Sequence, residues 1–554
     1  MDYASTGDKV FLTRDGRSTY ALVYPPPFLD FADRPDLPVK ASLDAQARTR
    51  GFDLKVTGYN LLAAGEDTAQ APSVLAETAL GALGALVVLV FVFASFLALV
   101  PLIIAAVSIV TTFLVVLGLT YLTDVSFIVQ FLIALVGLGV AIDYSLLLVN
   151  RWREERDHGR ENADAVLVAM QTAGRAVVSS AGTVAISLIA LLVIPVPFLR
   201  SMGLGGMLIP LVSTFVVLTL LPPCSAASAL ASTGRGSATR RRLLGRGAPG
   251  PGWWCGIAGW PPVPPWRSSA HSSCRCSVVP LFSLQIGAAR TESLARSGPA
   301  YQALQTLRQG GVPTGIVTPV EVLIRDGGDP AKVVAAARGV SGVASAFAPD
   351  NPVWRKGDSA MVNVIPTAET VDSKGSKVAE RIGAAVNDLP GVVGEAGAGP
   401  VVLDYIDAVY GAFPLVLGLI VLVTFVLLAR AFRSIVLPLK AVILNILSVS
   451  ATFGGMVLFW QLGHGSDEIF NVQSTGAITF WLPLLVFAFL FGLSMDYEVF
   501  ILSRMREEYD RTGSTSAAVV EGIGRTGRLV TSAALILSSP LSPSRLHRER
   551  ISRS

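Results

Sequence analysis

The sequence predicts a polytopic α-helical membrane protein, with a duplicated bundle of transmembrane helices and two polar blocks of α+β structure. The chain has 554 residues, of which 52% are hydrophobic and only 15% are charged, and its mean hydropathy is +0.57. Soluble domains carry roughly 25% charged residues. Uncharged runs long enough for spans of about 20 residues alternate with polar blocks at residues 1–75 and 285–405. One motif recurs 353 residues later, which indicates that the membrane part is duplicated.

The first polar block, residues 1–75, shows only part of a domain. Alternating apolar residues predict strands near 9–13, 18–24 and 52–57, and a helical pattern covers residues 39–50. These are the later elements of a β-α-β-β-α-β fold. We therefore interpret residues 1–75 as a partial α+β domain.

Residues 76–222 predict the first transmembrane half, with spans at 80–96, 101–120, 126–150, 176–194 and 198–221. No Lys, Arg, Asp or Glu occurs from residue 78 to residue 123, which is long enough for two of these spans. Pro195 and Pro197 separate the last two. A chain that starts in the cytoplasm needs one more crossing before residue 1, so we expect that a first span is missing.

Residues 223–284 form an abnormal segment of low order. It is rich in Arg, Ser, Pro, Gly, Cys and Trp, and six prolines between residues 249 and 265 exclude a regular helix. The orientation of the flanking spans nevertheless requires a crossing here. We interpret the segment as a frameshift that replaces a span, and residues 538–554 as an aberrant tail. The alternative is a Pro-rich cytoplasmic linker.

The second polar block, residues 285–405, predicts a complete ferredoxin-like domain. Short runs rich in Val and Ile predict strands near 320–325, 343–348, 360–366 and 392–396, and helical patterns cover 330–338 and 374–387. Their order is β-α-β-β-α-β, the order of a ferredoxin-like split fold.

Residues 406–537 predict a second, incomplete transmembrane half. Its spans cover 408–429, 435–460 and 476–503, and a further span begins near residue 528. Arginine-rich segments follow the spans that end near residues 150 and 503, and loops rich in positive charge lie in the cytoplasm. Both polar blocks are therefore expected outside the cytoplasm.

Two aspartates lie inside otherwise apolar spans, and a tyrosine follows each of them: Asp143-Tyr144 and Asp496-Tyr497. A carboxylate at mid-bilayer costs about 2.5–3.5 kcal/mol on insertion scales, so an acid in this place indicates function. A duplicated pair of such acids predicts a proton relay, in which the tyrosine hydroxyl beside each acid donates to the carboxylate or passes the proton on. The alternative is a structural aspartate held by a hydrogen-bond donor.

Small residues accompany both acids at a spacing of four: Gly137 and Ala141 in the first span, Ala488 and Gly492 in the second. Four residues separate neighbours on one helix face, and small residues there let membrane helices approach closely. We expect these four positions to support helix packing near the relay.

Several classes of chemistry are not expected. The chain has no Gly-x-x-x-x-Gly-Lys-Ser/Thr loop and no Ser-His-Asp cluster, so we predict no enzyme activity and no organic cofactor. Cys274, Cys276 and His271 are a poor zinc site because Cys-x-Cys is too short a spacing, so no metal is expected. Protons are the expected coupling ion, and nucleic acid is not an expected partner.

The residues around both acids resemble the MmpL family, a branch of the resistance-nodulation-division (RND) superfamily. Gly-Leu-Gly-Val-Ala-Ile precedes Asp143-Tyr144 and Arg-Trp-Arg-Glu-Glu follows at 151–155, while Gly-Leu-Ser-Met precedes Asp496-Tyr497 and Arg-Met-Arg-Glu-Glu follows at 504–508. The resemblance implies twelve spans and two extracytoplasmic porter domains of ferredoxin-like fold. It places the family's proton-relay pairs on Asp143-Tyr144 and Asp496-Tyr497.

The same resemblance implies a function: proton-motive-force-driven export of lipids or other hydrophobic molecules across the bacterial cell membrane. It implies membrane lipids, homo-oligomers and envelope accessory proteins as partners. This chain departs from the family pattern because its first, seventh and twelfth spans are not found, so we expect a truncated or frameshifted copy that does not transport. Two alternatives stay open, a SecDF-like auxiliary of protein translocation and a non-transporting sterol-sensing-like membrane protein. The paired Asp-Tyr motifs favour the exporter.

Overall fold

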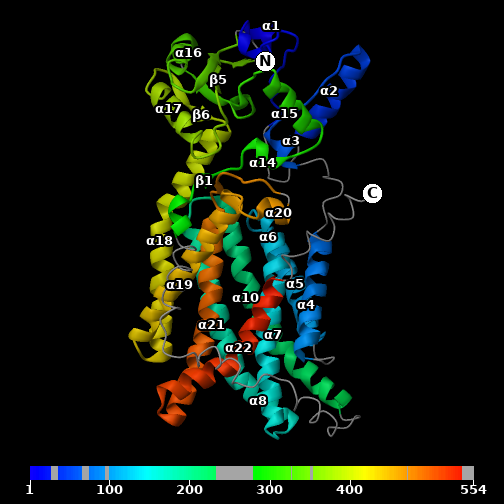
Figure 1. The fold of residues 1–554 in the computed structure, drawn as a ribbon, viewed down its shortest axis with the longest axis vertical. Helices are drawn as coiled ribbons and strands as arrows, with labels where there is room; N and C mark the ends of the chain where they lie inside the picture. The colour runs from blue at the N-terminus through cyan, green and yellow to red at the C-terminus, as the bar shows by residue number, and fades with distance from the viewer. Residues whose placement is uncertain are drawn as a thin grey trace. The chain divides into compact units, whose positions relative to one another are not determined.

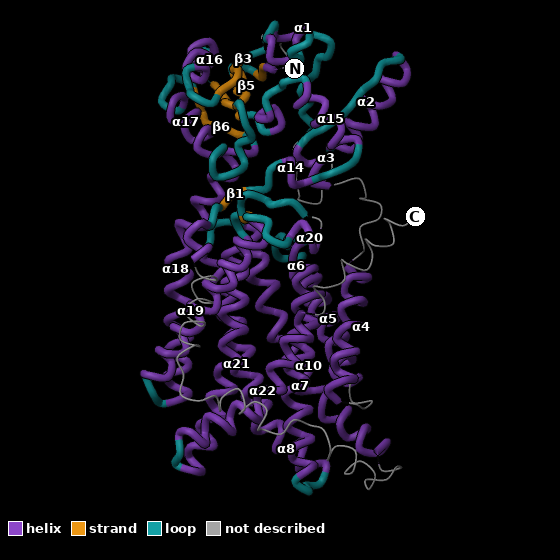
Figure 2. The backbone as a smooth tube through the Cα atoms, viewed as in Figure 1, coloured by secondary structure: helices purple, strands orange, loops and turns teal. Residues whose placement is uncertain are grey.

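Two sets of segments, interleaved along the chain, form two compact units in the computed structural model (Figure 1). The structure describes residues 1–26, 35–64, 74–93, 99–232, 279–325, 327–349, 354–470 and 472–538. The sheet unit comprises Met1–Ala71, Val278–Gly411 and Phe453–Leu484, and the helical unit comprises Pro72–Ser277, Ala412–Thr452 and Leu485–Ser554. All strands in the described ranges belong to the sheet unit (Figure 2).

The main sheet of the sheet unit has the ferredoxin-like topology that the sequence predicts. Its elements are β2 (Val320–Ile324), α16 (Pro330–Arg338), β3 (Val343–Phe347), β4 (Arg355–Lys356), β5 (Ser359–Pro366), α17 (Ser376–Val386) and β6 (Val392–Ala396). The strand order is β3-β5-β2-β6 with every pair antiparallel, and β4 pairs with β5. The predicted β-α-β-β-α-β order is confirmed.

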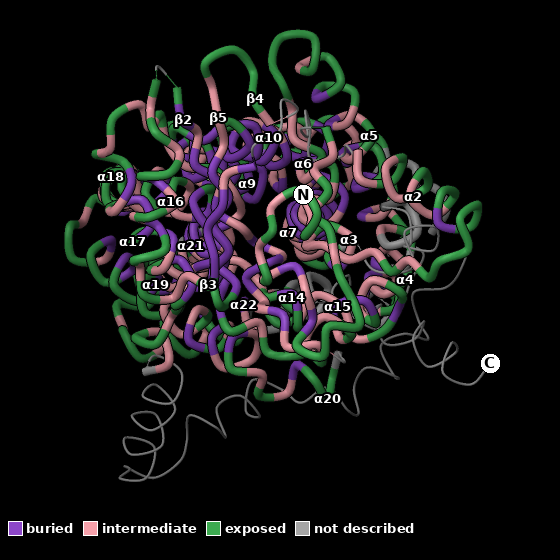
Figure 3. The backbone as a smooth tube through the Cα atoms, turned by 90° about the horizontal axis from the view of Figure 1, so that it is seen from above, coloured by how far each residue is buried: buried purple, intermediate pink, exposed green. Residues whose placement is uncertain are grey.

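Alternation of apolar residues explains this sheet. In β2 the residues Val320, Val322 and Ile324 are buried, while the residues between them are half-buried. The buried face packs against α16 and α17 through Val333 and Ile382, which belong to the same apolar cluster. Figure 3 shows the strands around β3 largely in the colour of buried residues. Apolar burial therefore stabilises the core between this sheet and its two helices.

The N-terminal block differs from the sequence prediction. The helix expected at 39–50 is present as α2 (Asp36–Arg50), after α1 (Tyr3–Thr6) and before α3 (Tyr59–Ala64). The strands expected near 9–13 and 18–24 were wrong: they reduce to one bridge between Leu12 and Thr19, and residues 9–11 form the 3₁₀ helix η1 (Lys9–Phe11). No strand forms at 52–57 either.

The reason for this difference lies in Phe11. Its side chain is fully buried, and its ring lies 5.2 Å from the ring of Phe347, centroid to centroid. Asp8 accepts a hydrogen bond from the backbone N–H of Val10 and so caps the short helix. The segment uses its apolar residues to cover the sheet, not to pair along an edge. Alternation alone cannot separate these two outcomes.

Shorter elements complete the sheet unit. The parallel pair β1 (Ile286–Gly287) and β7 (Ile478–Thr479) joins segments far apart in sequence. The others are η7 (Val279–Ser283), α14 (Thr291–Leu294), α15 (Pro299–Gln309), η8 (Thr314–Val317), the π-helical η10 (Val457–Gln461) and α20 (Ser466–Phe470).

Long helices make up the helical unit and run side by side in Figure 1. The first-half helices are α4 (Val74–Phe93), α5 (Leu99–Leu119), α6 (Ile128–Phe131), η3 (Leu132–Val136), α7 (Gly137–Asp157), α8 (Asn162–Ala169), η4 (Met170–Gly174), α9 (Arg175–Ile189), η5 (Ala190–Val193) and α10 (Pro197–Ser232). The second-half helices are α18 (Ala398–Phe432), α19 (Val436–Met456), α21 (Leu482–Thr512) and α22 (Thr515–Ser538).

Among the described residues, seven helices are long and apolar enough to cross a membrane. They correspond to the predicted spans with two exceptions. At 80–96, α4 carries a shorter apolar stretch, Gly81–Val90, and the span predicted from near residue 528 falls in α22, which is not among the seven. Within the first half, α7 contacts both α5 and α10. The central position of α7 explains why its residues are buried on nearly all sides.

The predicted abnormal segment 223–284 lies mostly outside the described residues, as does the predicted tail after Ser538. At its start, α10 continues as a helix past Pro222 and Pro223 to Ser232. The last part of this helix is rich in alanine, which has the highest helix propensity. The interpretation of 223–284 as a frameshift stays a prediction, as do the domain boundaries drawn from the sequence.

Candidate functional site

Asp143 lies on α7 in the middle of the first half, and it is only 5% exposed. The helix around it carries no other charged residue before Arg151, and Ile142, Ser145 and Leu146 are all fully buried. A turn of π-helix, η3, immediately precedes α7. Such turns are frequent at functional sites.

The partner of Asp143 comes from the other half of the molecule. The hydroxyl of Tyr497, on α21, donates a hydrogen bond of 2.8 Å to Oδ2 of Asp143. The second carboxylate oxygen, Oδ1, is buried and has no hydrogen-bond partner among the described residues. The two Asp-Tyr motifs therefore meet in space, although 354 positions separate these two residues in the chain.

The donor to Asp143 differs from the one that the sequence suggested. Adjacent residues of an α-helix point about 100° apart, so Tyr144 cannot face its own neighbour's carboxylate. Tyr144 is 1% exposed, and its hydroxyl accepts a hydrogen bond of 3.3 Å from Ser180 on α9. The tyrosine that donates a hydrogen bond to Asp143 is Tyr497, which belongs to the second Asp-Tyr motif.

Ser180 is a site residue that the sequence did not reveal. The repeat gave no signal for it, because the position 353 residues later is Ala533. A serine in an apolar helix is also common without any role, since its hydroxyl can bond to the preceding turn. Only the contact with Tyr144 distinguishes Ser180 from such a residue.

Asp496 lies on α21 next to Tyr497, but its side chain lies outside the described part of the structure. The backbone position is fixed by the helix, one residue before the tyrosine that reaches Asp143. The role of Asp496 therefore stays a prediction from the repeat.

The small residues near the acids have unequal surroundings. A Cβ atom added at Gly492 would lie 3.0 Å from Cα of Val184 and 3.3 Å from Oγ of Ser187, so α21 and α9 touch through their backbones there. A Cβ added at Gly137 would meet only side chains, at 3.7 Å. The close approach thus depends on Gly492, which lies one helical turn before Asp496.

Ala141 and Ala488 are both fully buried. Each lies four residues from its glycine, so it occupies the same helix face. A small buried residue at this place leaves room for the neighbouring helix near the carboxylate.

Charged residues follow the acids on both helices and connect the two halves. Arg151 forms an ion pair of 2.7 Å with Glu154, and at the repeated positions Arg504 forms one of 2.9 Å with Glu507. Arg504 also lies 3.5 Å from Glu154 across the halves. Two contacts between equivalent helices, one at the acid and one at this charged end, therefore tie α7 to α21.

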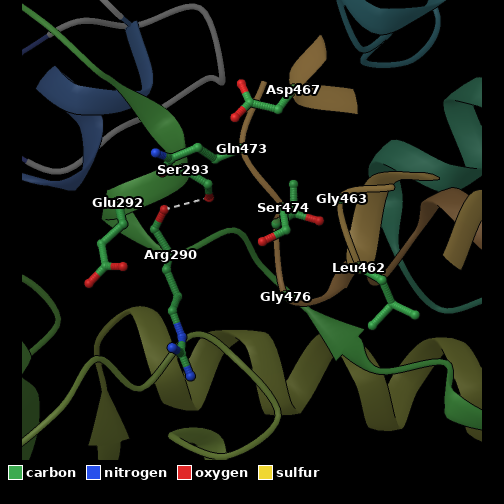
Figure 4. Close-up of a pocket in the computed structure, with 10 residues that line it drawn as sticks. Arg290, Glu292, Ser293, Leu462, Gly463, Asp467, Gln473, Ser474 and Gly476 are labelled. Atoms are coloured by element: carbon green, nitrogen blue, oxygen red, sulfur yellow. Dashed lines mark hydrogen bonds between the residues drawn. The ribbon is translucent and has the colours of Figure 1, made fainter. Parts of the chain in front are cut away.

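A polar pocket of about 320 Å³ lies apart from this site, within the sheet unit (Figure 4). Arg290 is paired with Asp372, and Arg296 with Asp467 at 2.5 Å. In Figure 4 the side chain of Arg290 extends away from Asp467, and its carbonyl accepts a hydrogen bond from Ser293. Arg290 and Asp467, which line the pocket, are each paired with an opposite charge, and such pairing is typical of a structural network.

A model of the MMPL family matches residues 2–264 and 316–542. The chain belongs to the MMPL family. Its predicted fold class, an RND-type membrane bundle with small α+β domains, is confirmed by this match together with the seven candidate spans. The chain is therefore a multi-pass membrane protein.

Two relatives of this MMPL chain carry names that state a substrate. This chain is 33% identical over 466 residues to the heme uptake protein MmpL11 of Mycobacterium tuberculosis, and the match covers 78% of this chain and 46% of that protein. It is 32% identical over 465 residues to the mycolic acid-containing lipids exporter MmpL11 of Mycolicibacterium smegmatis, covering 77% and 46%. The chain spans about half the length of the curated relatives it matches.

Among solved structures, the chain is similar to the hedgehog release protein Disp from the water bear Hypsibius dujardini. The TM-score is 0.59 at 14% sequence identity, with 85% of this chain and 66% of that chain covered. At this identity the similarity concerns the fold alone.

Proposed function

In place of the inactive copy expected from the missing spans, we propose that this MMPL chain acts in proton-driven export of lipids or other hydrophobic molecules across the bacterial cell membrane. Asp143, Tyr144, Asp496 and Tyr497 form its proton relay. The hydrogen bond from Tyr497 to Asp143 carries the proposal, because it brings the two repeated motifs together inside the membrane-type bundle. The name of the Mycolicibacterium smegmatis relative, a lipids exporter, supports the substrate class.

The relay couples a proton to a movement of the two halves. When Asp143 is charged, its Oδ2 accepts the hydrogen of the Tyr497 hydroxyl. When Asp143 takes up a proton, it loses the charge that strengthens this bond, so α7 and α21 are held together less tightly. A proton that crosses the membrane supplies about 2.3 kcal/mol for each 100 mV of potential. Alternation between the two states would drive the substrate outward.

The proposed orientation follows from the distribution of arginine. The arginine-rich ends of α7 and α21 lie in the cytoplasm, and the sheet unit, with its porter-like fold, lies outside. In a variant without native cysteines, an impermeant maleimide should label Ser42→Cys from outside and His158→Cys only after the membrane is opened. Both positions are exposed. Reversed labelling would contradict the orientation.

Proton flux tests the relay directly. The full chain is reconstituted into vesicles that contain a pH-sensitive dye, and a pH gradient is imposed. Asp143→Asn and Asp496→Asn should each lower the initial flux at least about tenfold, since an amide cannot carry the proton. Insertion should be unaffected, because loss of a buried charge eases it.

The matched control is Asp157→Asn, the same change at the exposed end of α7. It should leave the flux unchanged. Flux at the parent level in Asp143→Asn would disprove the relay, and no flux in the parent chain would disprove coupled transport by it.

A further inference from the structure

The two halves repeat a second time, on the helices that come before the acids. Both α5 and α19 have 21 residues, and both have Pro-Leu at their third and fourth positions, Pro101-Leu102 and Pro438-Leu439. The tenth position of each is polar: Ser108 in α5 and Asn445 in α19. Both pairs of positions are separated by 337 residues, so the helices match without a gap.

Both polar side chains lie on the buried face of a largely apolar helix, and in α5 the polar residue Thr112 is buried as well. Ser108 and Asn445 are each 1% exposed. Nearby residues of the same helices are turned outward, such as Val110 at 58% and Leu444 at 50% exposed. Serine and asparagine at the buried face of a membrane helix commonly form hydrogen bonds to a neighbouring helix, so an oxygen that lacks such a bond requires an explanation.

Asn445 connects α19 to the acid-bearing helix of its half. Its Nδ2 donates a hydrogen bond of 3.0 Å to the backbone carbonyl of Phe491 on α21. Phe491 is five residues before Asp496, which corresponds to about 7.5 Å along the helix axis. The other side-chain atom, Oδ1, is buried and has no partner among the described residues.

Ser108 occupies the same level in the first half. Its neighbour Ile109 lies 3.7 Å from the place where a Cβ atom of Gly137 would be. Gly137 is six residues before Asp143 on α7, about 9 Å along the axis. The hydroxyl of Ser108 is buried and has no partner among the described residues either. Each half thus places one unsatisfied buried oxygen before its acid.

A buried oxygen without a partner is costly, above all in a membrane span. Native proteins satisfy such atoms with ordered water, which forms two to four hydrogen bonds. At Asn445 the Oδ1 atom is the acceptor left for such a water, because Nδ2 already donates to the Phe491 carbonyl. A water molecule bound there lies on the side of the acid opposite the arginine-rich helix end.

We propose that Ser108 and Asn445 are water-binding residues of the proton path, one for each acid. The proposal rests on the relay function above and adds the route by which protons reach it. A water held by each residue takes a proton from the aqueous side and passes one to the carboxylate. One O–H bond forms and one breaks in each step, so the water is unchanged after the transfer.

Substitutions at Asn445 distinguish two roles of this residue: binding a water molecule, or only holding α19 to α21 through the hydrogen bond to the Phe491 carbonyl. Asn445→Leu removes both polar atoms at similar volume, and it should lower the proton flux about tenfold. Asn445→Ser copies the residue of the first half, which holds water but is too short to reach the Phe491 carbonyl. It should keep the flux within about twofold of the parent. Ser108→Val should repeat the loss seen with leucine.

The matched control is Thr452→Val, an exposed position on the same helix. The Thr452 hydroxyl is satisfied by the carbonyl of Ser448 in its own helix, so the flux should not change. Parent-level flux in Asn445→Leu would overturn the proposal. An equal loss in Asn445→Ser and Asn445→Leu would overturn it as well, because that result indicates that Asn445 only holds α19 to α21.

A second measurement detects the water itself. Met495 is fully buried, one turn after Phe491 on α21, and methionine reacts readily with hydroxyl radicals. Radiolysis of the full chain in vesicles should oxidise Met495 in the parent and in Asn445→Ser, and at least about fivefold less in Asn445→Leu. Absence of Met495 oxidation in the parent would overturn the water site even where flux is normal. Failure of the relay function instead appears as parent flux that Asp143→Asn does not change.

Discussion

The ferredoxin-like sheet and the helical unit solve the problem of burial in opposite ways. Between the sheet and its two helices the buried side chains are apolar, among them Val322, Val364 and Ile382. In the helical unit, large apolar side chains face outward, such as Leu114 at 63% and Phe215 at 67% exposed, while Asp143 is buried.

The surrounding solvent explains the difference. In water, apolar area removed from solvent stabilises a core by about 25 cal/mol per Å². In lipid the surroundings are as apolar as leucine, so helices associate through close packing and hydrogen bonds. The interior of the helical unit is therefore the place where polar groups gain most from a partner, and it is also where the proposed chemistry lies.

The largest expected effect concerns the apolar core of the sheet. Val322→Asp buries an unpaired charge and should cost at least about 4 kcal/mol of folding free energy. Leu323→Asp, on the half-buried face of the same strand, should cost about 1 kcal/mol. Urea-dependent proteolysis of the purified chain, mapped to residues 320–396, measures both. Equal sensitivity of the two variants would contradict the one-sided core.

Close backbone contact in the helical unit gives the next effect. Gly492→Ala places a Cβ atom 3.0 Å from the backbone of Val184 and should destabilise the unit by about 1–3 kcal/mol. Gly137→Ala meets only ordinary contacts at 3.7 Å and should be neutral. The melting temperature in detergent compares them. If both substitutions are tolerated, α21 and α9 do not depend on a glycine.

A hydroxyl deletion tests the polar interior. Tyr497→Phe removes the hydrogen bond to Asp143 and should lower the proton flux about tenfold. Tyr410→Phe is the matched control, because the Tyr410 hydroxyl donates to the carbonyl of Phe480 in the sheet unit. It should leave the flux unchanged. A similar decrease in both variants would show that the effect is general destabilisation.

The smallest effect concerns a carboxyl group of the sheet unit. Burial, and to a smaller extent the charge of Asp404, raise the pKa of Glu395 to about 7. The folded state therefore binds the proton more tightly than the unfolded state, and stability falls as pH rises from about 4.5 through 7. Glu395→Gln should gain about 1 kcal/mol above pH 7, because solvent screens the half-buried group, and nothing at pH 4. Melting curves of the parent and of Glu395→Gln at the two pH values measure this difference. A gain in stability at pH 4 would contradict a raised pKa of Glu395.

The sequence predictions were correct where the signal lies within one segment, and wrong where the structure depends on contacts between distant segments. The sheet at residues 320–396 was predicted correctly, because alternation and turn residues lie within each strand. The strands near 9–13 and 18–24 were wrong, because Phe11 buries its ring against Phe347, more than 300 residues away. No local pattern contains that partner.

The site shows the same limit. Asp143 and Tyr497 were both identified from the repeat, but their contact was not. The periodicity of a helix shows which of its faces is buried, but it does not show which other helix packs against that face. Ser180 carried no repeat signal at all. Ser108 and Asn445 became visible only when helix boundaries, burial and unsatisfied atoms were known.

The sequence by itself predicted seven helices that are long and apolar enough to span a membrane, the β-α-β-β-α-β order, and the two acids that a span cannot hold without cost. Charge, hydropathy and periodicity are properties of neighbouring residues, so they can be read along the chain. Only the tertiary structure decided that Tyr497 serves Asp143 and that α21 touches α9 through Gly492. These contacts depend on how the two halves pack, and packing is set by surfaces that no single segment contains.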